Sequence, residues 1–320
     1  MIAIIFLCIF AALFLAGCLS FSKVKKEADE RFSYYESKSE TINTSYGKVT
    51  YIDERASSEN PDMGSETIFS VHGICGGYDQ AYMICSPYAG KYRLLAPSRF
   101  GYPGSDLPEN ATIDMQVEAF VELLNQLKLD KVYMLTTSAG GTCAIKFALQ
   151  HPERLKGLIM YSSGVPEYPA TENPEKKKKY AGPPAAFCND FAMWFWSPLF
   201  KPLMGMNSEA LKLILPMKQR KAGIIFDGKE SNTVMSNYPV EYNLSNIEVP
   251  VLIIHSKDDK LADFEKVEPW ISAIKNCTFV PLENGGHMMD GNSDLVEHAV
   301  CDFIEAGVSE LWTANPSDFH

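Results

Sequence analysis

Ser138 lies in the stretch Thr136-Thr137-Ser138-Ala139-Gly140-Gly141, where a predicted strand meets a predicted helix. Small neighbours permit the sharp turn that would lift the Ser138 hydroxyl above the edge of a sheet. The helix N-terminus behind it offers N–H groups and the positive end of a dipole to developing negative charge. The pattern predicts a nucleophilic serine. A plain N-cap serine is the alternative, because Thr136 stands where the Gly-x-Ser-x-Gly pattern has glycine.

A nucleophilic serine needs a general base, and the base needs an acid to orient it. Among six histidines, His287 follows the last predicted strand and two glycines that would let its ring reach over the sheet edge. An exposed turn histidine is the alternative interpretation. The acid candidates Asp258 and Asp259 follow another predicted strand, close to His255.

A glycine-rich turn, Val71-His72-Gly73-Ile74-Cys75-Gly76-Gly77, follows an earlier predicted strand. With this turn, the serine turn and the Gly-Gly-His turn, the chain resembles the α/β-hydrolase family over about residues 47–308. The order serine, aspartate, histidine along the chain matches that family, and not the chymotrypsin or subtilisin orders.

The resemblance implies a catalytic triad of Ser138, Asp259 and His287. The family's acid stands fourth after the strand-end histidine, and counting from His255 gives Asp259. Ser256 replaces the glycine usual in that turn, so Asp258 remains the second candidate for the acid.

The resemblance also implies an oxyanion hole formed by the backbone N–H groups of Ile74 and Ala139. Removing one such donor from an acyl-transfer enzyme costs roughly 100- to 1,000-fold in rate. His72 is expected to be structural. Arg99 and Tyr102 lie in a turn that is similar to one at the site mouth of capped hydrolases, and a structural role is expected for both.

The predicted elements alternate between strands and helices, which implies βαβ units and a mostly parallel sheet covered by helices on both faces. The resemblance makes this an α/β-hydrolase fold. The core is expected at 47–164 and 246–310, with a mainly helical cap inserted at 165–245 and a tail at 311–320. Strands are predicted at 47–54, 66–71, 92–97, 131–136, 155–162, 249–255 and 277–282, and helices at 111–128, 138–150 and 294–306.

The segment 165–245 breaks the alternation with seven prolines and a dense aromatic block. Aromatic side chains over the site would favour an apolar acyl or alkyl group. Packing on the core is the equal alternative for Trp194, Trp196 and Phe200.

Residues 2–19 form an apolar run without a charge, so residues 1–20 are expected to be a signal peptide or membrane anchor and 21–46 a linker helix. Leu15-Ala16-Gly17-Cys18 resembles the lipobox of bacterial lipoproteins, which implies an exported protein with lipid on Cys18. The positive charges follow the run and none precedes it, which favours an uncleaved helix with a cytoplasmic domain. Both interpretations tether the chain to a membrane.

The 320 residues are 46% hydrophobic with a net charge of −11, which fits a globular protein and argues against binding nucleic acid. Scattered cysteines without Cys-x-x-Cys pairs, and the absence of nucleotide or zinc motifs, predict no cofactor and no metal. We expect a serine hydrolase of small or medium apolar esters acting through an acyl-serine. The same triad would serve an aminopeptidase, a thioesterase or a perhydrolase, and a catalytically inactive binding lipoprotein is the third hypothesis.

Overall fold

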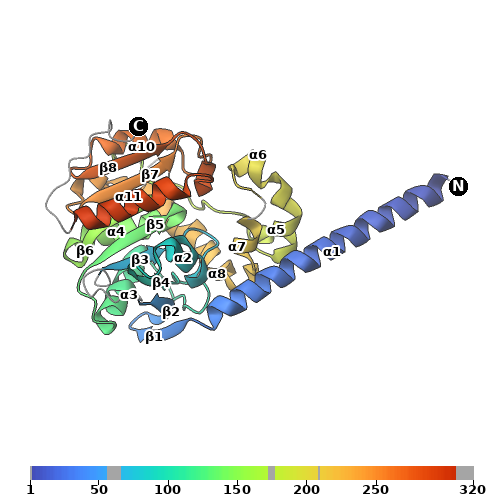
Figure 1. Ribbon diagram of the computed structural model, residues 1–320, viewed down its shortest axis with the longest axis horizontal. Helices are drawn as coiled ribbons and strands as arrows, with labels where there is room; N and C mark the ends of the chain where they lie inside the picture. The colour runs from blue at the N-terminus through green and yellow to red at the C-terminus, as the bar shows by residue number, and fades with distance from the viewer. Residues whose placement is uncertain (1, 56–65, 172–176, 208–209, 308–320) are drawn as a thin grey trace.

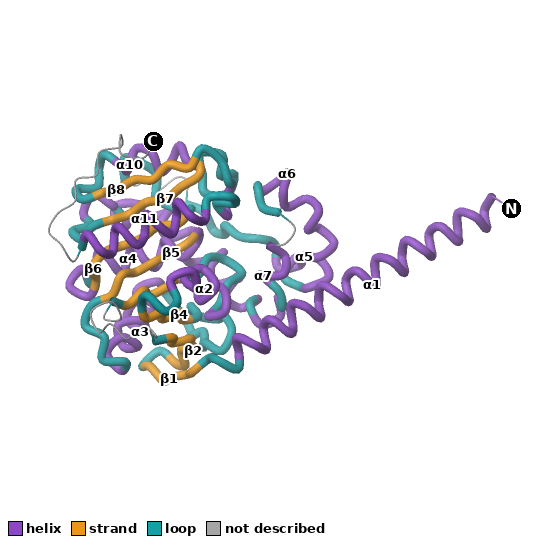
Figure 2. Tube along the Cα trace, in the orientation of Figure 1, coloured by secondary structure: helices purple, strands orange, loops and turns teal. Residues whose placement is uncertain are grey.

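The computed structural model describes residues 2–55, 66–171, 177–207 and 210–307. Eight strands form one sheet in the order β1-β2-β4-β3-β5-β6-β7-β8 (Figures 1 and 2). β1 and β2 pair antiparallel, β2 pairs antiparallel with β4, and the remaining neighbours are parallel. The strands are β1 Glu40–Thr44, β2 Gly47–Glu54, β3 Thr67–Val71, β4 Arg93–Pro97, β5 Val132–Thr137, β6 Leu155–Tyr161, β7 Val251–Ser256 and β8 Cys277–Leu282.

The sheet is buried on both faces, which explains why its central strands are apolar along their whole length. Side chains alternate between the faces along each strand: in β6, Leu158 and Met160 join the core under α3, α4 and α10, whereas Ile159 and Tyr161 join the core under α2 and α11. The helices flanking the sheet are α2 Tyr78–Cys85, α3 Ile113–Gln126, α4 Gly141–Gln150, α10 Phe264–Ile271 and α11 Ser293–Ala306.

The insertion between β6 and β7 is helical in its described part, as we expected for the cap at 165–245. Its α-helices are short: α5 Asp190–Trp196, α6 Phe200–Met204, α7 Ala210–Ile214, α8 Lys221–Phe226 and α9 Asn232–Asn237. 3-10 turns join α5 to α6 and precede α8, and a π-helix at Asp227–Ser231 joins α8 to α9. We call the described residues of 165–245 the cap.

The N-terminal region differs from the expectation of a linker helix over 21–46. One helix, α1, runs from Ile2 to Glu36, and β1 then pairs with β2 across a tight turn at residues 45–46. The C-terminal part of α1 packs on the body through the buried side chains of Ala28 and Phe32. Its N-terminal part extends away from the body (Figure 1). Among the described helices, none combines the length and the apolar character needed to cross a bilayer.

A buried ion pair joins the cap to the sheet. The Arg99 guanidinium, after β4, donates to both carboxylate oxygens of Asp227 beyond α8, and the Tyr102 hydroxyl donates to the same carboxylate. Arg99 and Asp227 are 1% and 0% exposed at their side chains, so each charge depends on the other for compensation.

We predict that Asp227→Asn lowers the free energy of unfolding by about 3–5 kcal/mol, because it leaves the Arg99 charge buried without a counter-charge. The matched control is Glu305→Gln, which breaks the ion pair of Lys91 with a carboxylate that is 59% exposed. That control should cost less than about 1 kcal/mol. Denaturant unfolding followed by circular dichroism measures both, and equal losses would contradict the prediction.

Candidate active site

Three loops at the carboxyl edge of the sheet bring a serine, a histidine and an aspartate into one hydrogen-bonded chain. The Oγ of Ser138, after β5, lies 2.9 Å from Nε2 of His287, after β8. Nδ1 of His287 lies 2.9 and 3.1 Å from the two carboxylate oxygens of Asp259, after β7. His287 and Asp259 are buried, so the contact between these two side chains is shielded from water.

Ser138 sits in a left-handed backbone conformation, with φ of 51°. This conformation turns the chain sharply from β5 into the helix that follows, as the small residues around the serine predicted. Glycines make room for the turn. A Cβ on Gly73 would lie 3.0 Å from the Ser138 Cβ, and one on Gly140 would lie 2.8 Å from the Thr136 Oγ1. Thr136 therefore fits where the pattern has glycine, because Gly140 carries no side chain.

The two candidate acids have different partners. Asp259 faces His287 and also accepts from the backbone N–H groups of Leu261 and Ala262. Burial alone would raise the pKa of the Asp259 carboxyl, but its hydrogen bonds and the charge of His287 outweigh burial and lower it. Asp258 instead accepts from the backbone N–H of Gly286 at 2.8 Å, and so holds the turn that carries His287.

His255 lies beside the Asp259 carboxylate, but its Nε2 makes its hydrogen bond to a different group. Its Nε2 is 2.6 Å from the carbonyl oxygen of Ala262 and 3.5 Å from Asp259. Burial lowers the pKa of His255, which favours the neutral imidazole. A neutral ring whose Nε2 donates to a carbonyl supports the loop around Asp259 without competing for the role of base.

The glycine-rich turn after β3 lies against Ser138, and Gly73 and Ile74 both line the cavity beside it. Nε2 of the fully buried His72 accepts from the backbone N–H of Arg99. Burial, with the charge of Arg99, holds the pKa of His72 well below its usual value, so the ring is neutral. The Arg99 guanidinium donates in turn to the carbonyl oxygens of His72 and Gly73. His72 and Arg99 thus shape this turn and do not face the cavity.

A cavity of about 310 Å³ adjoins Ser138 and His287. Its walls come from the core and from the cap, and most of them are apolar. Tyr161 and Gln80 add polar groups, and the side chains that line it include no carboxylate, lysine or arginine. Its apolar walls are Ile74, Met83, Ile84, Met206, Ala210, Leu213, Ile214, Leu261, Met288 and Met289.

The aromatic block of the cap does not line this cavity. Phe200 is buried in a separate apolar cluster that Trp194 packs against, and Trp196 is exposed. The interpretation that placed these rings over the substrate is not supported, and packing accounts for Trp194 and Phe200. The methionines and leucines that do line the cavity come from five separate segments, so no local pattern in the sequence marks them.

The described cysteines are free thiols, and Cys18 is exposed on α1. The described residues contain no group of histidine, cysteine, aspartate or glutamate side chains that could hold a metal ion.

A mostly parallel sheet with a helical insertion, and with a serine, a histidine and an aspartate at its carboxyl edge, defines a hydrolase of the α/β class. Comparison with known proteins agrees. Residues 66–187 match the profile of the alpha/beta hydrolase fold, and the chain belongs to that family.

Two curated relatives and one solved structure show the range of similar proteins. Proline iminopeptidase of Saccharolobus solfataricus is 28% identical over 75% of this chain and 85% of its own. The 2-hydroxy-6-oxo-6-phenylhexa-2,4-dienoate hydrolase of Burkholderia cepacia is 27% identical over 73% of this chain and 79% of its own. The structure of a bacterial membrane phospholipase A aligns with a TM-score of 0.66 and 17% identity, over 97% of this chain and 100% of that one. At this identity the last likeness concerns the fold alone.

The different partners of Asp258 and Asp259 lead to a prediction. Asp259→Asn should slow the reaction of Ser138 with a fluorophosphonate by about a thousandfold or more, because His287 loses the carboxylate that orients it. Asp258→Asn keeps an oxygen that can accept from Gly286, so the rate should fall by less than about tenfold. Time-resolved labelling followed by mass spectrometry measures both rates. The reverse order would make Asp258 the acid.

Proposed function

We propose that this chain is a serine hydrolase that cleaves a small or medium apolar carboxylic ester through an acyl-serine intermediate. The observation that carries the proposal is the 2.9 Å contact between the Ser138 Oγ and the His287 Nε2 beside an uncharged, apolar cavity. Contact with a base activates the serine hydroxyl, and an apolar cavity suits an acyl group.

Each proton transfer in the proposed reaction has a named donor and acceptor. With Nδ1–H donated to Asp259, the free Nε2 of His287 takes the Ser138 proton as Oγ attacks the ester carbonyl. The backbone N–H groups of Ile74 and Ala139 would stabilise the oxyanion of the tetrahedral intermediate. His287 then gives the proton to the departing alkoxide. In the second half, His287 takes a proton from the water that attacks the acyl-serine, and it gives that proton to the departing Ser138 Oγ as the acid is released.

The cavity lining lacks carboxylate, lysine and arginine side chains, and this favours a neutral substrate over the substrates that two relatives are named for. An iminopeptidase acts on a chain with a free amino terminus, and a carboxylate would be needed to pair with that amine. A dienoate carries a carboxylate, which would call for lysine or arginine. The side chains lining this cavity include neither kind of partner. Burying an unpaired charge there would be costly, so a neutral ester fits better.

The proposal predicts that Ser138→Ala lowers the hydrolysis of p-nitrophenyl butyrate by at least about 10,000-fold, because the triad acts as a unit. The control Ser37→Ala changes an exposed serine directly after α1 and should leave the rate unchanged. A fluorophosphonate adduct should form on Ser138 and be lost in Ser138→Ala.

Two outcomes would contradict the proposal. An adduct on Ser138 without turnover of p-nitrophenyl esters of any acyl length would show an activated serine that does not cleave these esters. Cleavage of a thioester or formation of a peracid would then replace ester hydrolysis as the reaction. No adduct on a folded sample would exclude an activated serine and favour a binding protein.

A further inference from the structure

The cap exposes a cluster of large apolar side chains on α5, α6 and the turn between them. Phe191 and Phe195 are each 57% exposed and Leu203 is 68% exposed. Phe195 lies next to both Phe191 and Trp196, with ring centroids 6.2 and 5.4 Å apart. Single exposed apolar residues are ordinary, but a contiguous group marks an interaction site. We call this group the cap patch; it comprises Phe191, Phe195, Trp196, Leu199 and Leu203.

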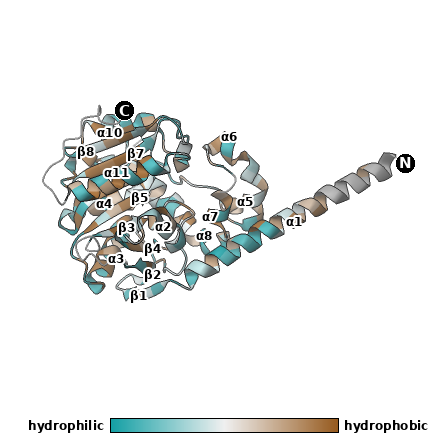
Figure 3. Cartoon of the chain, viewed as in Figure 1, coloured by the Kyte–Doolittle hydropathy of each residue, from teal (hydrophilic) through white to brown (hydrophobic). Residues whose placement is uncertain are grey.

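The cap patch continues onto α1. The ring of Phe21 lies 5.6 Å from the ring of Phe191 and 5.5 Å from that of Trp194. Toward the N-terminus from this contact, Leu19, Leu15 and Phe14 are each at least 60% exposed. Along α1, hydropathy changes from hydrophilic beside the core to hydrophobic as the helix passes α5 (Figure 3). Two segments far apart in the sequence therefore present one apolar surface.

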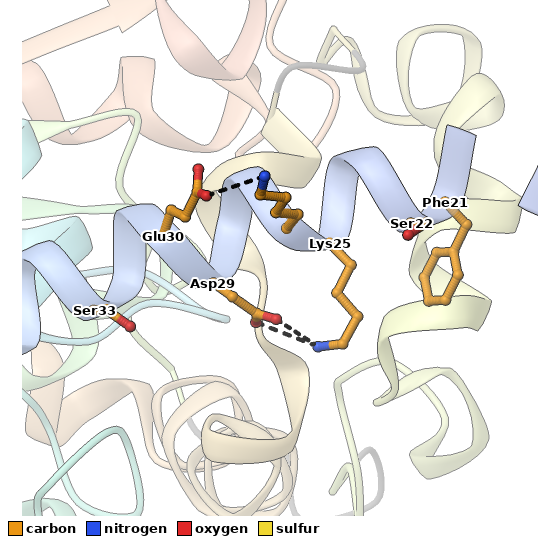
Figure 4. A pocket seen from close by; sticks show the side chains of 7 residues that line it. Phe21, Ser22, Lys25, Asp29, Glu30 and Ser33 are labelled. Carbon is orange, nitrogen blue, oxygen red and sulfur yellow. Dashed lines mark hydrogen bonds and ion pairs between the residues drawn. The ribbon is translucent and has the colours of Figure 1, made fainter. Parts of the chain in front are cut away.

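Charge around this surface is arranged to suit phosphate headgroups. From 191 to 207 the chain has one charged residue, the exposed Lys201, although the whole chain carries 40 acidic residues. On α1 the lysines stand nearest the apolar end. Lys25 pairs with Asp29 one turn further toward the core and, at 3.0 Å, with Asp190 at the start of α5, and Lys26 pairs with Glu30 (Figure 4 shows the pairs within α1). An apolar surface bordered by lysines is typical of segments that rest on a lipid surface.

The cap patch is also connected to the catalytic histidine. α6 ends at Met204 and is capped by Gly205, and a Cβ on Gly286 would lie 2.8 Å from the Gly205 carbonyl oxygen. The next residue, Met206, lines the cavity beside Ser138. The chain therefore passes from the exposed Leu203 to the cavity wall within three residues.

We propose that the cap patch and the adjoining apolar end of α1 dock on a phospholipid surface, and that the ester reaches Ser138 from that surface past α6 and α7. The substrate would then be an acyl ester dissolved in lipid. This inference rests on the proposed ester hydrolysis for its substrate, whereas the docking itself does not depend on catalysis.

Docking is tested first in the full-length Ser138→Ala chain, so that no turnover interferes. Phosphatidylcholine vesicles with brominated acyl chains quench tryptophans that enter the lipid. Trp196 belongs to the patch and the buried Trp270 does not. We expect quenching to be at least about twofold weaker when Trp196→Phe is added, because a docked patch lies at the acyl boundary. Equal quenching with and without Trp196 would overturn the docking of the cap, even if α1 holds the chain on the vesicle.

The route of the substrate is tested with Phe195→Asp and Leu203→Asp, neither of which lines the cavity. The control Leu107→Asp places the same charge on an exposed leucine outside the cap. We expect p-nitrophenyl butyrate in solution to be hydrolysed within about twofold of the parent rate by all three variants. Hydrolysis of p-nitrophenyl palmitate held in phosphatidylcholine vesicles should fall about tenfold in the two patch variants only, because each loses an apolar contact with lipid.

The outcomes separate the two proposals. If the parent chain does not hydrolyse p-nitrophenyl butyrate, ester hydrolysis fails while the quenching result still decides docking. If it hydrolyses that ester and the patch variants keep full activity on vesicles, the lipid route is wrong. Sedimentation that shows a dimer split by Leu203→Asp, without a change in quenching or in vesicle hydrolysis, would make the patch an interface between two copies.

Discussion

The left-handed backbone at Ser138 is the constraint on which the rest of the site depends. The left-handed conformation costs a residue with a side chain roughly 1–2 kcal/mol of conformational free energy. It persists only where contacts with the surrounding structure hold it in place. Here β5 is held between β3 and β6 in parallel register, with Val71 opposite Thr136. Gly73 and Gly140 leave the space that the turn needs. The neighbouring strands thus fix where the hydroxyl projects, and Asp259 and His287 reach toward it from the ends of β7 and β8.

Two buried arginines make the cap and the glycine-rich turn one rigid unit. Arg99 joins Asp227 of the cap to the Gly73 carbonyl, and Arg220 of the cap joins Asp79 of α2 to the Gly76 carbonyl. Swinging the cap away from this side would separate two ion pairs inside the protein, which is strongly unfavourable. The proposed substrate path lies on the other side of the cap, where Gly205 at the end of α6 approaches the Gly286 turn through its backbone.

The central strands and the chemical motifs were predictable from the sequence because both are local patterns. Continuous apolar runs marked β3 to β8, and the residues at their ends marked the serine and the histidine. β1 was missed because its five residues, Glu40–Thr44, are mostly polar and pair at the sheet edge. α10 was missed because it is short and contains Pro269. The cavity walls and the partners of the buried arginines depend on contacts between distant segments. The hydrophobic periodicity of a sequence does not predict such contacts.

The distribution of charge favours one orientation of the molecule on a lipid surface. Exposed charges act over about 10 Å at ordinary ionic strength, so an acidic body is repelled from anionic headgroups only on the sides that carry its carboxylates. The stretch 191–207 carries none, and Lys201 is its single charge. Repulsion on the sides that carry carboxylates and apolar burial here act in the same direction. Both turn the end of α6 toward the lipid, which is the side where Met206 and Gly205 lead to His287.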